Sequence, residues 1–563
     1  MNWIFLKNLY NHSMEIKQLR NLLKFVNIDR EVISIVVIYA IVIGFFSLSI
    51  PVAVQNLVNS VAFGSVLLPI FVLSFIVFIG LGLSGVLKLA QRYVVETVSL
   101  NVFYHTTLKL GSHLTMVKEE ALDYSFDRSF SARYVELFSI QKNITVFLVE
   151  SLEFILVVGS GMLIVALYHP AFLIFDIFLA FALYYTVAHL GGDGVKTKKS
   201  ESEGKYQTLS WIMNLSRPSV VLRGFKGIEL AQKRTQNLGN EFIEYRKKHF
   251  SLLMKKFVGL ILIGVLASSL LLGVGGFLVF KNQLSLGQLV AAEIILAGVL
   301  GMISKLDKII ENYYNLVASV DKVESLFKIP SEPLVSNLYH LPKIIGDFEF
   351  NALEYYYNPK RNLWNPITHS FPKGTKVAIV GPSGAGKSTL LELIYGLRSP
   401  SNGSIRVDGM NYKDIDVLYL RDRMGFAGKF EALPNTLKEN ILLGKEVDFS
   451  HVVNLAKEFL LEEVIQNLPM GYQTTLDSSM LPFSDGQLAR LSLLRAMVHS
   501  PDVLLVDEVL DDLDKQKKQI LVTKIFELMV GKTVFIVTHD DSISRQCDLI
   551  LDLQSGALLR GGA

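Results

Sequence analysis

Long apolar runs dominate the N-terminal half of the chain. The longest, at 32–87, contains no charged side chain. Because about 20 apolar residues cross a bilayer as a helix, this run is long enough for two spans. Turn-forming and polar residues near its middle predict a hydrated break there: Pro51, Asn56, Asn59 and Gly64. We therefore expect spans near 32–54 and 65–87, and four more near 145–167, 170–190, 257–280 and 288–304.

The connections between these runs differ in positive charge. The short connections at 55–64, 168–169 and 281–287 contain a single lysine, whereas those at 88–144 and 191–256 contain seven and fourteen basic residues. Lysine and arginine are retained on the cytoplasmic side of membrane proteins. The pattern therefore predicts a multi-pass protein of the cell membrane, in a bacterium the inner membrane, with both termini in the cytoplasm.

The two long cytoplasmic connections are predicted to be largely helical. Apolar residues recur at roughly helical spacing in both, for example Phe103 and Leu110 in one and Phe242 and Tyr245 in the other. The spanning helices are thus expected to continue into the cytoplasm. Basic residues precede the first apolar run without a cleavable apolar core, so 1–31 is expected to be a retained cytoplasmic segment.

The pattern changes after the sixth run. Prolines interrupt a stretch without periodicity at 326–343, which predicts a linker after a transmembrane domain at 32–325. In the remainder, 344–563, helical segments alternate with uncharged β-branched runs, which suit buried parallel strands: 377–380, 503–506 and 533–537. The expected fold is an all-α six-helix membrane domain joined to an α/β P-loop NTPase domain.

Composition supports two domains in different solvents. The chain has 563 residues, of which 50% are hydrophobic and 19% charged. The net charge of +3 gives no sign of a nucleic-acid partner, because polyanion binders normally carry a large basic excess. Cys547 is the only cysteine, which excludes an intrachain disulfide and a cluster of thiolate metal ligands.

One glycine-rich loop carries the clearest chemical signal. It follows the first predicted strand, precedes a helical run, and consists of Gly381, Pro382, Ser383, Gly384, Ala385, Gly386, Lys387, Ser388 and Thr389. The glycines let successive N–H groups point at phosphate oxygens beside the helix N-terminus. Lys387 is expected to reach the β- and γ-phosphates, and the hydroxyl of Ser388 to ligate Mg²⁺. The loop therefore predicts an ATP site.

Acidic and imidazole groups follow two of the other strands. Asp507 ends the strand at 503–506 and is expected at the sheet edge beside the loop, as a ligand of Mg²⁺. Glu508 is the candidate general base for the attacking water, with a place on an acidic surface as the alternative. His539 follows the strand at 533–537 and is expected to contact the γ-phosphate.

Several further segments carry a family resemblance. Residues 483–487, Phe-Ser-Asp-Gly-Gln, resemble the signature motif of ATP-binding cassette (ABC) proteins, and an arginine-bearing helix follows them. The segments 435–441, 511–514 and 284–289 are similar to the family as well. With six spans ahead of one cassette, the chain resembles a half-transporter of the type I ABC exporter class. The resemblance covers nearly its full length.

The resemblance implies an arrangement of two chains. Two cassettes would dimerise head to tail, with ATP between the loop of one chain and the signature of the other: Ser484, Asp485, Gly486 and Gln487. Tyr357 matches the position of the family's adenine-stacking aromatic residue, with packing on the core as the alternative. Asp514 matches another nucleotide-site position. Short helices near 123–132 and 209–222 would pass the motion of the cassettes to the spans.

Two positions depart from the family pattern. The third signature position is usually glycine, and here Asp485 places a carboxylate near a bound triphosphate. The glutamine that senses Mg²⁺ and the γ-phosphate is replaced by Lys429 or, with one gap, Gly428. A protonated lysine cannot ligate Mg²⁺, so we expect altered coupling between nucleotide state and the membrane domain. Hydrolysis is still expected.

Three functions remain open at this stage. The first is ATP-driven export of a peptide, protein, lipid or hydrophobic compound by a homodimer. The second is one half of a heterodimer with a weakened site, and the third is a membrane regulator that senses ATP without transport. Acids in or near the spans favour a cationic cargo, with a position outside the hydrocarbon as the alternative: Glu150, Glu153, Asp176 and Glu293. Maturation of a leader peptide is not expected, because no cysteine peptidase domain precedes the spans.

Overall fold

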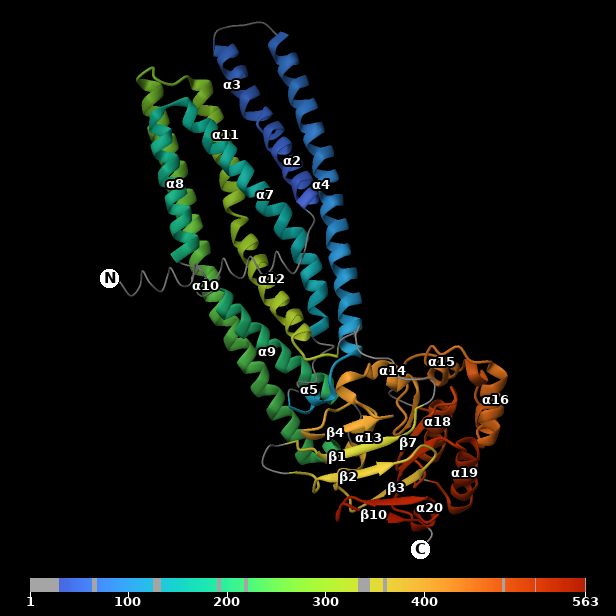
Figure 1. The fold of residues 1–563 in the computed structure, drawn as a ribbon. Coiled ribbons are helices and arrows are strands. Elements are labelled where there is room, and N and C mark those ends of the chain that lie inside the picture. Colours follow the sequence, from blue (N-terminus) through green and yellow to red (C-terminus); the bar gives the residue numbers. More distant parts are fainter. Residues whose placement is uncertain are drawn as a thin grey trace. The chain divides into compact units, whose positions relative to one another are not determined.

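A computed structural model describes nine stretches of the chain, 30–62, 68–124, 133–189, 194–216, 221–332, 345–357, 362–477, 481–511 and 513–561. Most of the predicted N-terminal segment and of the predicted linker lies outside these residues. The chain divides into two compact units (Figure 1). One is formed within Met1–Val117 and Ser125–Ser331, and the other within Lys118–Tyr124 and Glu332–Ala563.

The first unit is helical. Its helices are α2 (Arg30–Ser47), α3 (Ser49–Ala62), α4 (Leu68–Thr115), α7 (Glu136–Tyr168), α8 (Pro170–His189), α9 (Gly194–Leu215), α10 (Phe225–Phe280), α11 (Leu286–Ile303) and α12 (Leu306–Phe327). Six stretches among the described residues are long and apolar enough to cross a membrane: Glu31–Val61, Ile70–Thr115, Glu136–Tyr168, Pro170–Val187, Phe225–Phe280 and Leu286–Phe327. The prediction of six spans is confirmed, and the chain is a multi-pass membrane protein.

The predicted break in the first apolar run is wrong in detail. The helix is interrupted at Leu48, and Pro51, Asn56 and Asn59 lie inside α3. Pro51 is tolerated because the first turn of a helix needs no N–H donor. Asn56 donates to the carbonyl of Val52 and Asn59 accepts from a backbone N–H of α11, so both amides have hydrogen-bond partners within the protein. Gly64 lies outside the described residues.

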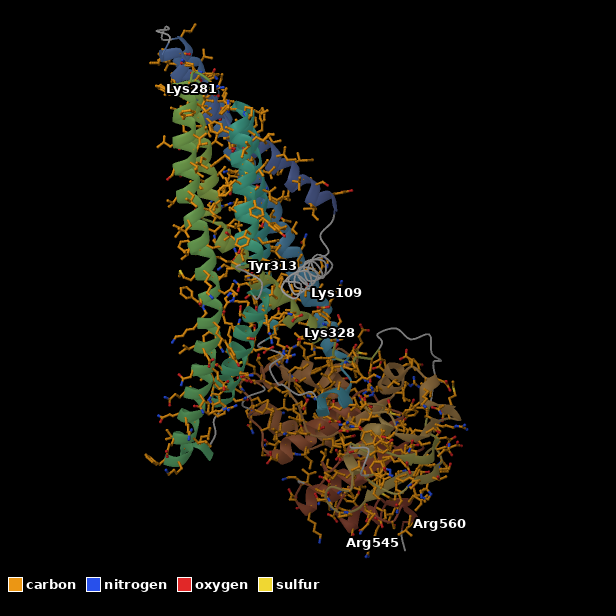
Figure 2. All side chains as sticks on the ribbon, turned by 90° about the vertical axis from the view of Figure 1, so that its left-hand side faces the viewer. Lys109, Lys281, Tyr313, Lys328, Arg545 and Arg560 are labelled. Atoms are coloured by element: carbon orange, nitrogen blue, oxygen red, sulfur yellow. The ribbon has the colours of Figure 1, made fainter. Side chains whose placement is uncertain are left out.

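Helices extend well beyond the apolar runs, as predicted. Helix α4 has 48 residues and α10 has 56. The segment predicted as a short helix near 209–222 instead contains the end of α9 and a single 3-10 turn, Val221–Arg223, while 217–220 lie outside the described residues. The other predicted short helix, near 123–132, lies largely outside them. Figure 2 shows few nitrogen or oxygen atoms along the bundle between the labelled Lys281 and Tyr313, as expected for surface facing lipid.

A buried carboxylate joins three helices of this unit. Glu136 is only 4% exposed, on the first turn of α7. It accepts hydrogen bonds from Lys205 and Tyr206 on α9 and from Ser319 on α12. Each of its donors comes from a segment distant in sequence, so the contact fixes the relative positions of the three helices.

The second unit is the α/β cassette. A six-stranded sheet has the order β10 (Ala557–Arg560), β9 (Leu549–Asp552), β3 (Lys376–Val380), β8 (Thr533–Val537), β7 (Val503–Asp507) and β6 (Met424–Ala427). A four-stranded sheet has the order β2 (Ile367–Phe371), β1 (Phe348–Glu354), β4 (Asn402–Val407) and β5 (Met410–Asn411). Strands β9, β3, β8, β7 and β6 run parallel, so the three predicted strands are confirmed as a buried parallel core.

Helices cover the parallel sheet. They are α13 (Lys387–Ile394), α14 (Val417–Asp422), α15 (Leu437–Leu442), α16 (Phe449–Glu458), α17 (Glu462–Gln466), α18 (Asp485–Met497), α19 (Lys515–Leu528) and α20 (Asp541–Ser544). The parallel strands present their carboxyl ends along one edge, where ligands bind in open α/β sheets. Asp507 is the last residue of β7, and His539 follows β8 by two residues. The sheet thus places both predicted site residues at that edge.

A short helix from the N-terminal half of the chain packs in the cassette unit. Helix α5 (Glu119–Tyr124) carries Asp123, which pairs with Arg398 at 2.5 Å. Arg398 is only 6% exposed and also pairs with Glu392. A carboxylate of α5, on Glu120, accepts from the backbone N–H of Ser399 at 2.7 Å. These contacts hold α5 beside the segment that follows α13.

Candidate functional site

The loop after β3 has the backbone shape of a phosphate cradle. Gly381, Gly384 and Gly386 adopt φ values of 153°, 80° and 89°, where residues with a Cβ are strained. A Cβ at Gly386 would lie 2.5 Å from a ring carbon of Trp364, so the third glycine is required by packing as well. Helix α13 begins at Lys387, directly after the loop. The predicted context of strand, loop and helix is confirmed.

The ammonium of Lys387 is held inside the loop. Its side chain is 4% exposed and donates to the carbonyl of Gly381 at 3.2 Å. It also donates to Nε2 of His539 at 2.9 Å and lies 3.5 Å from a carboxylate oxygen of Glu508. The structure therefore brings together three of the predicted site residues, from three different strand ends, around one buried cation.

Ser388 and Asp507 meet at the start of α13. The hydroxyl of Ser388 donates to a carboxylate oxygen of Asp507 at 3.0 Å. Burial raises the pKa of Asp507, against the lowering effect of this hydrogen bond. A hydroxyl and a carboxylate within hydrogen-bond distance beside a phosphate loop are hard oxygen ligands, the type that Mg²⁺ prefers. The two residues fit the predicted metal position.

Glu508 has an unusual backbone. Its φ is 56°, in the left-handed region, and its N–H donates to the carbonyl of Val537 on β8 at 3.2 Å. Such a conformation in a residue with a long side chain costs about 1 kcal/mol or more and concentrates at functional sites. Its carboxylate lies 3.4 Å from Nε2 of His539. The side chain is 49% exposed and lies toward Lys387 and His539.

Asp511 is a site residue that sequence reasoning missed. It accepts from the hydroxyl of Thr538 at 2.7 Å and from the backbone N–H of His539 at 3.0 Å. Asp511 thereby fixes the backbone from which the imidazole projects. The sequence offered only its place in an acidic run, because its partner His539 follows β8 and lies 28 residues away in the chain.

The tyrosine predicted to stack on adenine lies beside the loop. The hydroxyl of Tyr357 is 2.9 Å from the hydroxyl of Thr389, and its ring lies 5.0 Å from the guanidinium of Arg398. Its neighbour Tyr355 is only 5% exposed and packs into the core. Of these two, Tyr357 is the one that the structure places at the loop.

The signature segment begins helix α18. Ser484 caps the helix, and its N–H donates to the side chain of Gln487 at 2.8 Å. Asp485 is the first helical residue, where the helix dipole favours a negative charge. Gly486 accepts from the guanidinium of Arg490 at 3.2 Å. Asp514 caps α19 through the N–H of Lys517 at 3.0 Å.

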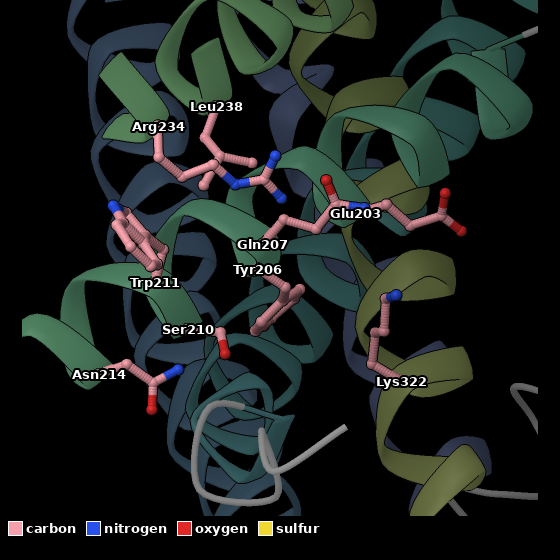
Figure 3. Close-up of a pocket in the computed structure, with 9 residues that line it drawn as sticks. All are labelled: Glu203, Tyr206, Gln207, Ser210, Trp211, Asn214, Arg234, Leu238 and Lys322. Atoms are coloured by element: carbon pink, nitrogen blue, oxygen red, sulfur yellow. The ribbon is translucent and has the colours of Figure 1, made fainter. Parts of the chain in front are cut away.

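One cavity in each unit bears on function. In the cassette, a cavity of about 500 Å³ is lined by Asp485 as well as Asp507 and Glu508, and includes no residue of the loop 381–389. In the helical unit, a cavity of about 320 Å³ is lined by residues of α9, α10 and α12, among them Tyr206, Arg234 and Lys322 (Figure 3). No prediction from the sequence concerned this second cavity.

Two of the acids noted in the spans are paired. Glu150 lies 2.8 Å from the ammonium of Lys308, and Glu153 lies 3.0 Å from that of Lys88. Ion pairing between helices therefore accounts for these two charges. Within the described residues, the side chains of Asp176 on α8 and Glu293 on α11 form no ion pair. The prediction of a cationic cargo therefore rests on these two acids.

The geometry defines a class: a P-loop nucleotide-binding cassette in one chain with six membrane helices. Residues 364–511 match the sequence model of the family described as ABC transporter. In fold, the chain is similar to a solved structure described as a bacterial Atm1-family ABC exporter with ATP bound, with a TM-score of 0.82 and 19% identity, covering 94% of this chain and 95% of that chain. Residues 364–511 therefore carry the sequence pattern of the ABC transporter family, and the chain has the fold of that solved exporter.

The chain aligns with only a part of each curated relative. The chain is 30% identical over 294 residues to the Toxin RTX-I translocation ATP-binding protein of Actinobacillus pleuropneumoniae, which covers 52% of this chain and 41% of that protein. It is 33% identical over 231 residues to ABC transporter B family member 16 of Arabidopsis thaliana, covering 40% of this chain and 19% of that protein. The chain thus spans less than half of the length of either relative.

Proposed function

We propose that this chain is one half of a dimeric exporter that couples ATP hydrolysis to outward movement of a cargo. The observation that carries the proposal is the meeting of Lys387, Glu508 and His539 at the ends of three parallel strands, in a chain with six membrane helices. The proposed cargo is a broad class of molecule: a peptide, protein, lipid or hydrophobic compound. The name of the toxin-translocation relative supports a polypeptide within that class.

ATP would be bound by the loop and by a partner chain. The N–H groups of 381–389 and the ammonium of Lys387 would hold the phosphates, and Tyr357 would stack on the adenine. The signature residues Ser484 to Gln487 of the other chain would close the site. Since each chain supplies half of each site, ATP stabilises the closed dimer, and its loss allows reopening.

Hydrolysis would use the acid at the end of β7. Glu508 would accept a proton from the water that attacks the γ-phosphorus, while the bond from that phosphorus to the ADP oxygen breaks. His539, held by Asp511, would contact the γ-phosphate. Ser388 and Asp507 would hold Mg²⁺, which when bound neutralises charge on the phosphates.

Motion would pass between cassette and spans through α5. The ion pair between Asp123 and Arg398 ties this helix to the cassette, and Arg398 also lies over the ring of Tyr357. One arginine therefore contacts both the helix and the proposed adenine platform. With both termini in the cytoplasm, as the basic residues of the long connections indicate, α5 lies on the cytoplasmic side.

A heterodimer is the second candidate, and Asp485 is the observation that favours it. In a symmetric dimer each of the two triphosphates would face an Asp485 carboxylate, whereas a partner chain with glycine at that position would make one of the two signatures neutral. Purified alone, a homodimeric protein hydrolyses ATP, and a heterodimeric one requires its partner.

The test uses the full chain in lipid vesicles. We expect Mg²⁺-dependent ATPase activity that falls at least about 100-fold in Glu508→Gln, with nucleotide binding retained, because the amide cannot accept the proton. Glu527→Gln, on the exposed surface of α19, is the matched control and should hydrolyse normally. An ATPase that survives Glu508→Gln would contradict the proposed base. Absence of ATP-dependent cargo movement into inverted vesicles, across a panel of cargoes, would favour the regulator.

A further inference from the structure

The turn that carries His539 is held by two carboxylates. Asp511 accepts from the hydroxyl of Thr538 at 2.7 Å and from the backbone N–H of His539 at 3.0 Å. The next residue, Asp540, donates its N–H to the same hydroxyl at 3.0 Å, and its carboxylate accepts from the N–H and hydroxyl of Ser542 at the start of α20. The imidazole therefore projects from a turn that is fixed both before and after it.

Both carboxylates face one ammonium. Lys518, near the start of α19, donates to Oδ2 of Asp540 at 2.9 Å, and its Nζ lies 4.0 Å from Oδ1 of Asp511. Its side chain is 13% exposed, less than that of either acid. The hydrogen bond from Lys518 is the main cause that lowers the pKa of Asp540 to about 2. Asp540 therefore keeps its charge at neutral pH, and the ion pair is partly shielded from water.

Lys518 differs from two other lysines of the same helix. Lys517 pairs with Asp514 and Lys524 pairs with Glu527, each three positions away along the chain and each with a more exposed ammonium side chain. Such exposed local pairs contribute little to stability. Lys518 instead reaches 22 positions along the chain, from α19 to the turn after β8. It joins three segments: the one that follows β7, the start of α19 and the start of α20.

We infer that Lys518 is a positioning residue for His539. The inference rests on the proposed function, in which His539 contacts the γ-phosphate. Lys518 acts through Asp540 and Asp511, and it does not line the cassette cavity that His539 lines. With the ammonium between them, the two like charges can both hold the turn; without it they repel each other, and the turn shifts. Every contact in this network lies within one chain.

The affinities for ATP and for ADP, measured with Mg²⁺ in the Glu508→Gln background by isothermal titration of the full chain in lipid nanodiscs, test this inference. Because only ATP has a γ-phosphate, a displaced imidazole should weaken ATP binding and spare ADP binding. We expect Lys518→Met to lower the affinity for ATP about tenfold and to leave that for ADP within about twofold, while Lys518→Arg retains most of the ATP affinity. Lys524→Met, on the same helix, is the matched control. Equal losses for ATP and ADP would reveal a merely structural role and overturn the inference, as would no loss.

Two further variants keep the outcome clear. In the His539→Ala background, Lys518→Met should not change the ratio of ATP to ADP affinity further, and an additive loss would contradict action through the imidazole. If Lys518→Met fails to fold, Asp540→Asn decides, since it keeps an oxygen for Ser542 and loses the charge. Its ratio should fall in the same direction, and an unchanged ratio counts against Lys518.

The binding comparison also separates this inference from the proposed function. It needs no turnover, so an unaltered chain that binds ATP without hydrolysing it would refute the proposed ATPase. The ratio of ATP to ADP affinity would still decide the role of Lys518.

Discussion

Asp507 and Glu508 are adjacent in sequence and differ in every physical respect that matters for their proposed roles. Asp507 ends β7 in extended conformation and is bonded to Ser388. Glu508 turns into the left-handed region, at φ 56°, which directs its side chain to Lys387 and His539. The reversal of the backbone between them lets two neighbouring carboxylates serve the metal position and the proposed base position separately.

Binding of nucleotide with Mg²⁺ should be sensitive to acid because of Asp507. Burial raises the pKa of this carboxyl, and only the deprotonated form ligates Mg²⁺. Affinity should therefore be full above the raised pKa and fall as the pH drops through it, at a pH above the usual range for aspartate. The measurement is the affinity of the Glu508→Gln variant for ATP across pH, with and without Mg²⁺. A Mg²⁺-dependent affinity that stays constant down to pH 4 would contradict this assignment.

The site residues that directly follow a strand were predictable from the sequence. The site residues whose role depends on contacts with distant segments were not. The loop 381–389, Asp507 and His539 are predictable because strand, turn and chemistry are all local. Asp511 and Arg398 are not, since their roles depend on contacts with Thr538 and with α5. Tertiary packing decides such contacts, and no local pattern encodes it.

At the scale of elements, three long helices depend on one carboxylate. Glu136 on α7 accepts from Lys205, Tyr206 and Ser319, which lie on α9 and α12. Apolar spacing in the sequence correctly predicted helices that continue past the apolar runs. It did not predict how they are joined, because a single glutamate in a helical run is ordinarily a surface residue.

Removing this carboxylate should destabilise the helical unit. We expect Glu136→Ala to cost about 3 kcal/mol, because it leaves the buried hydroxyls of Tyr206 and Ser319 without their acceptor. Lys205→Ala should cost about 1 kcal/mol or less, since the side chain of Lys205 is 48% exposed. Thermal unfolding in detergent ranks the two variants. Equal shifts in unfolding temperature would show that the lysine, and not the buried hydroxyls, dominates.

At the scale of the whole molecule, the fold class can be predicted from the sequence, because the two units carry different patterns. Long apolar runs suit helices in a bilayer, and short β-branched runs suit the buried strands of a domain in water. Six apolar runs and a set of short β-branched runs predicted a membrane bundle and a parallel sheet, and both are confirmed. The exception is the boundary between units. Residues 118–124 pack with the cassette although the spans surround them in sequence. Chain order alone assigns that segment to the membrane domain.

The single thiol reports on the cassette in the intact protein. Cys547 is 3% exposed, and burial raises its pKa to about 12, so it is neither accessible nor ionised in the folded state. We expect negligible labelling by a maleimide in native vesicles and rapid labelling after the cassette unfolds. Cys547→Ser is the control for background. Rapid labelling of the native protein would show that the region around Cys547 opens readily.

The place of α5 has a practical consequence for dividing the molecule. A cassette produced from residue 332 onward lacks Asp123 and Glu120, and Arg398 keeps only Glu392 as its carboxylate partner. Such a fragment exposes the surface around Arg398 and Ser399 to which the six-residue acidic helix α5 binds in the full chain. A synthetic peptide that contains 118–124 should bind it in trans, and a version with Asp123 replaced by asparagine should bind more weakly. Within the cassette unit, α5 is therefore bound to the rest of the cassette as a peptide ligand is bound to its receptor, with the covalent chain keeping the two together.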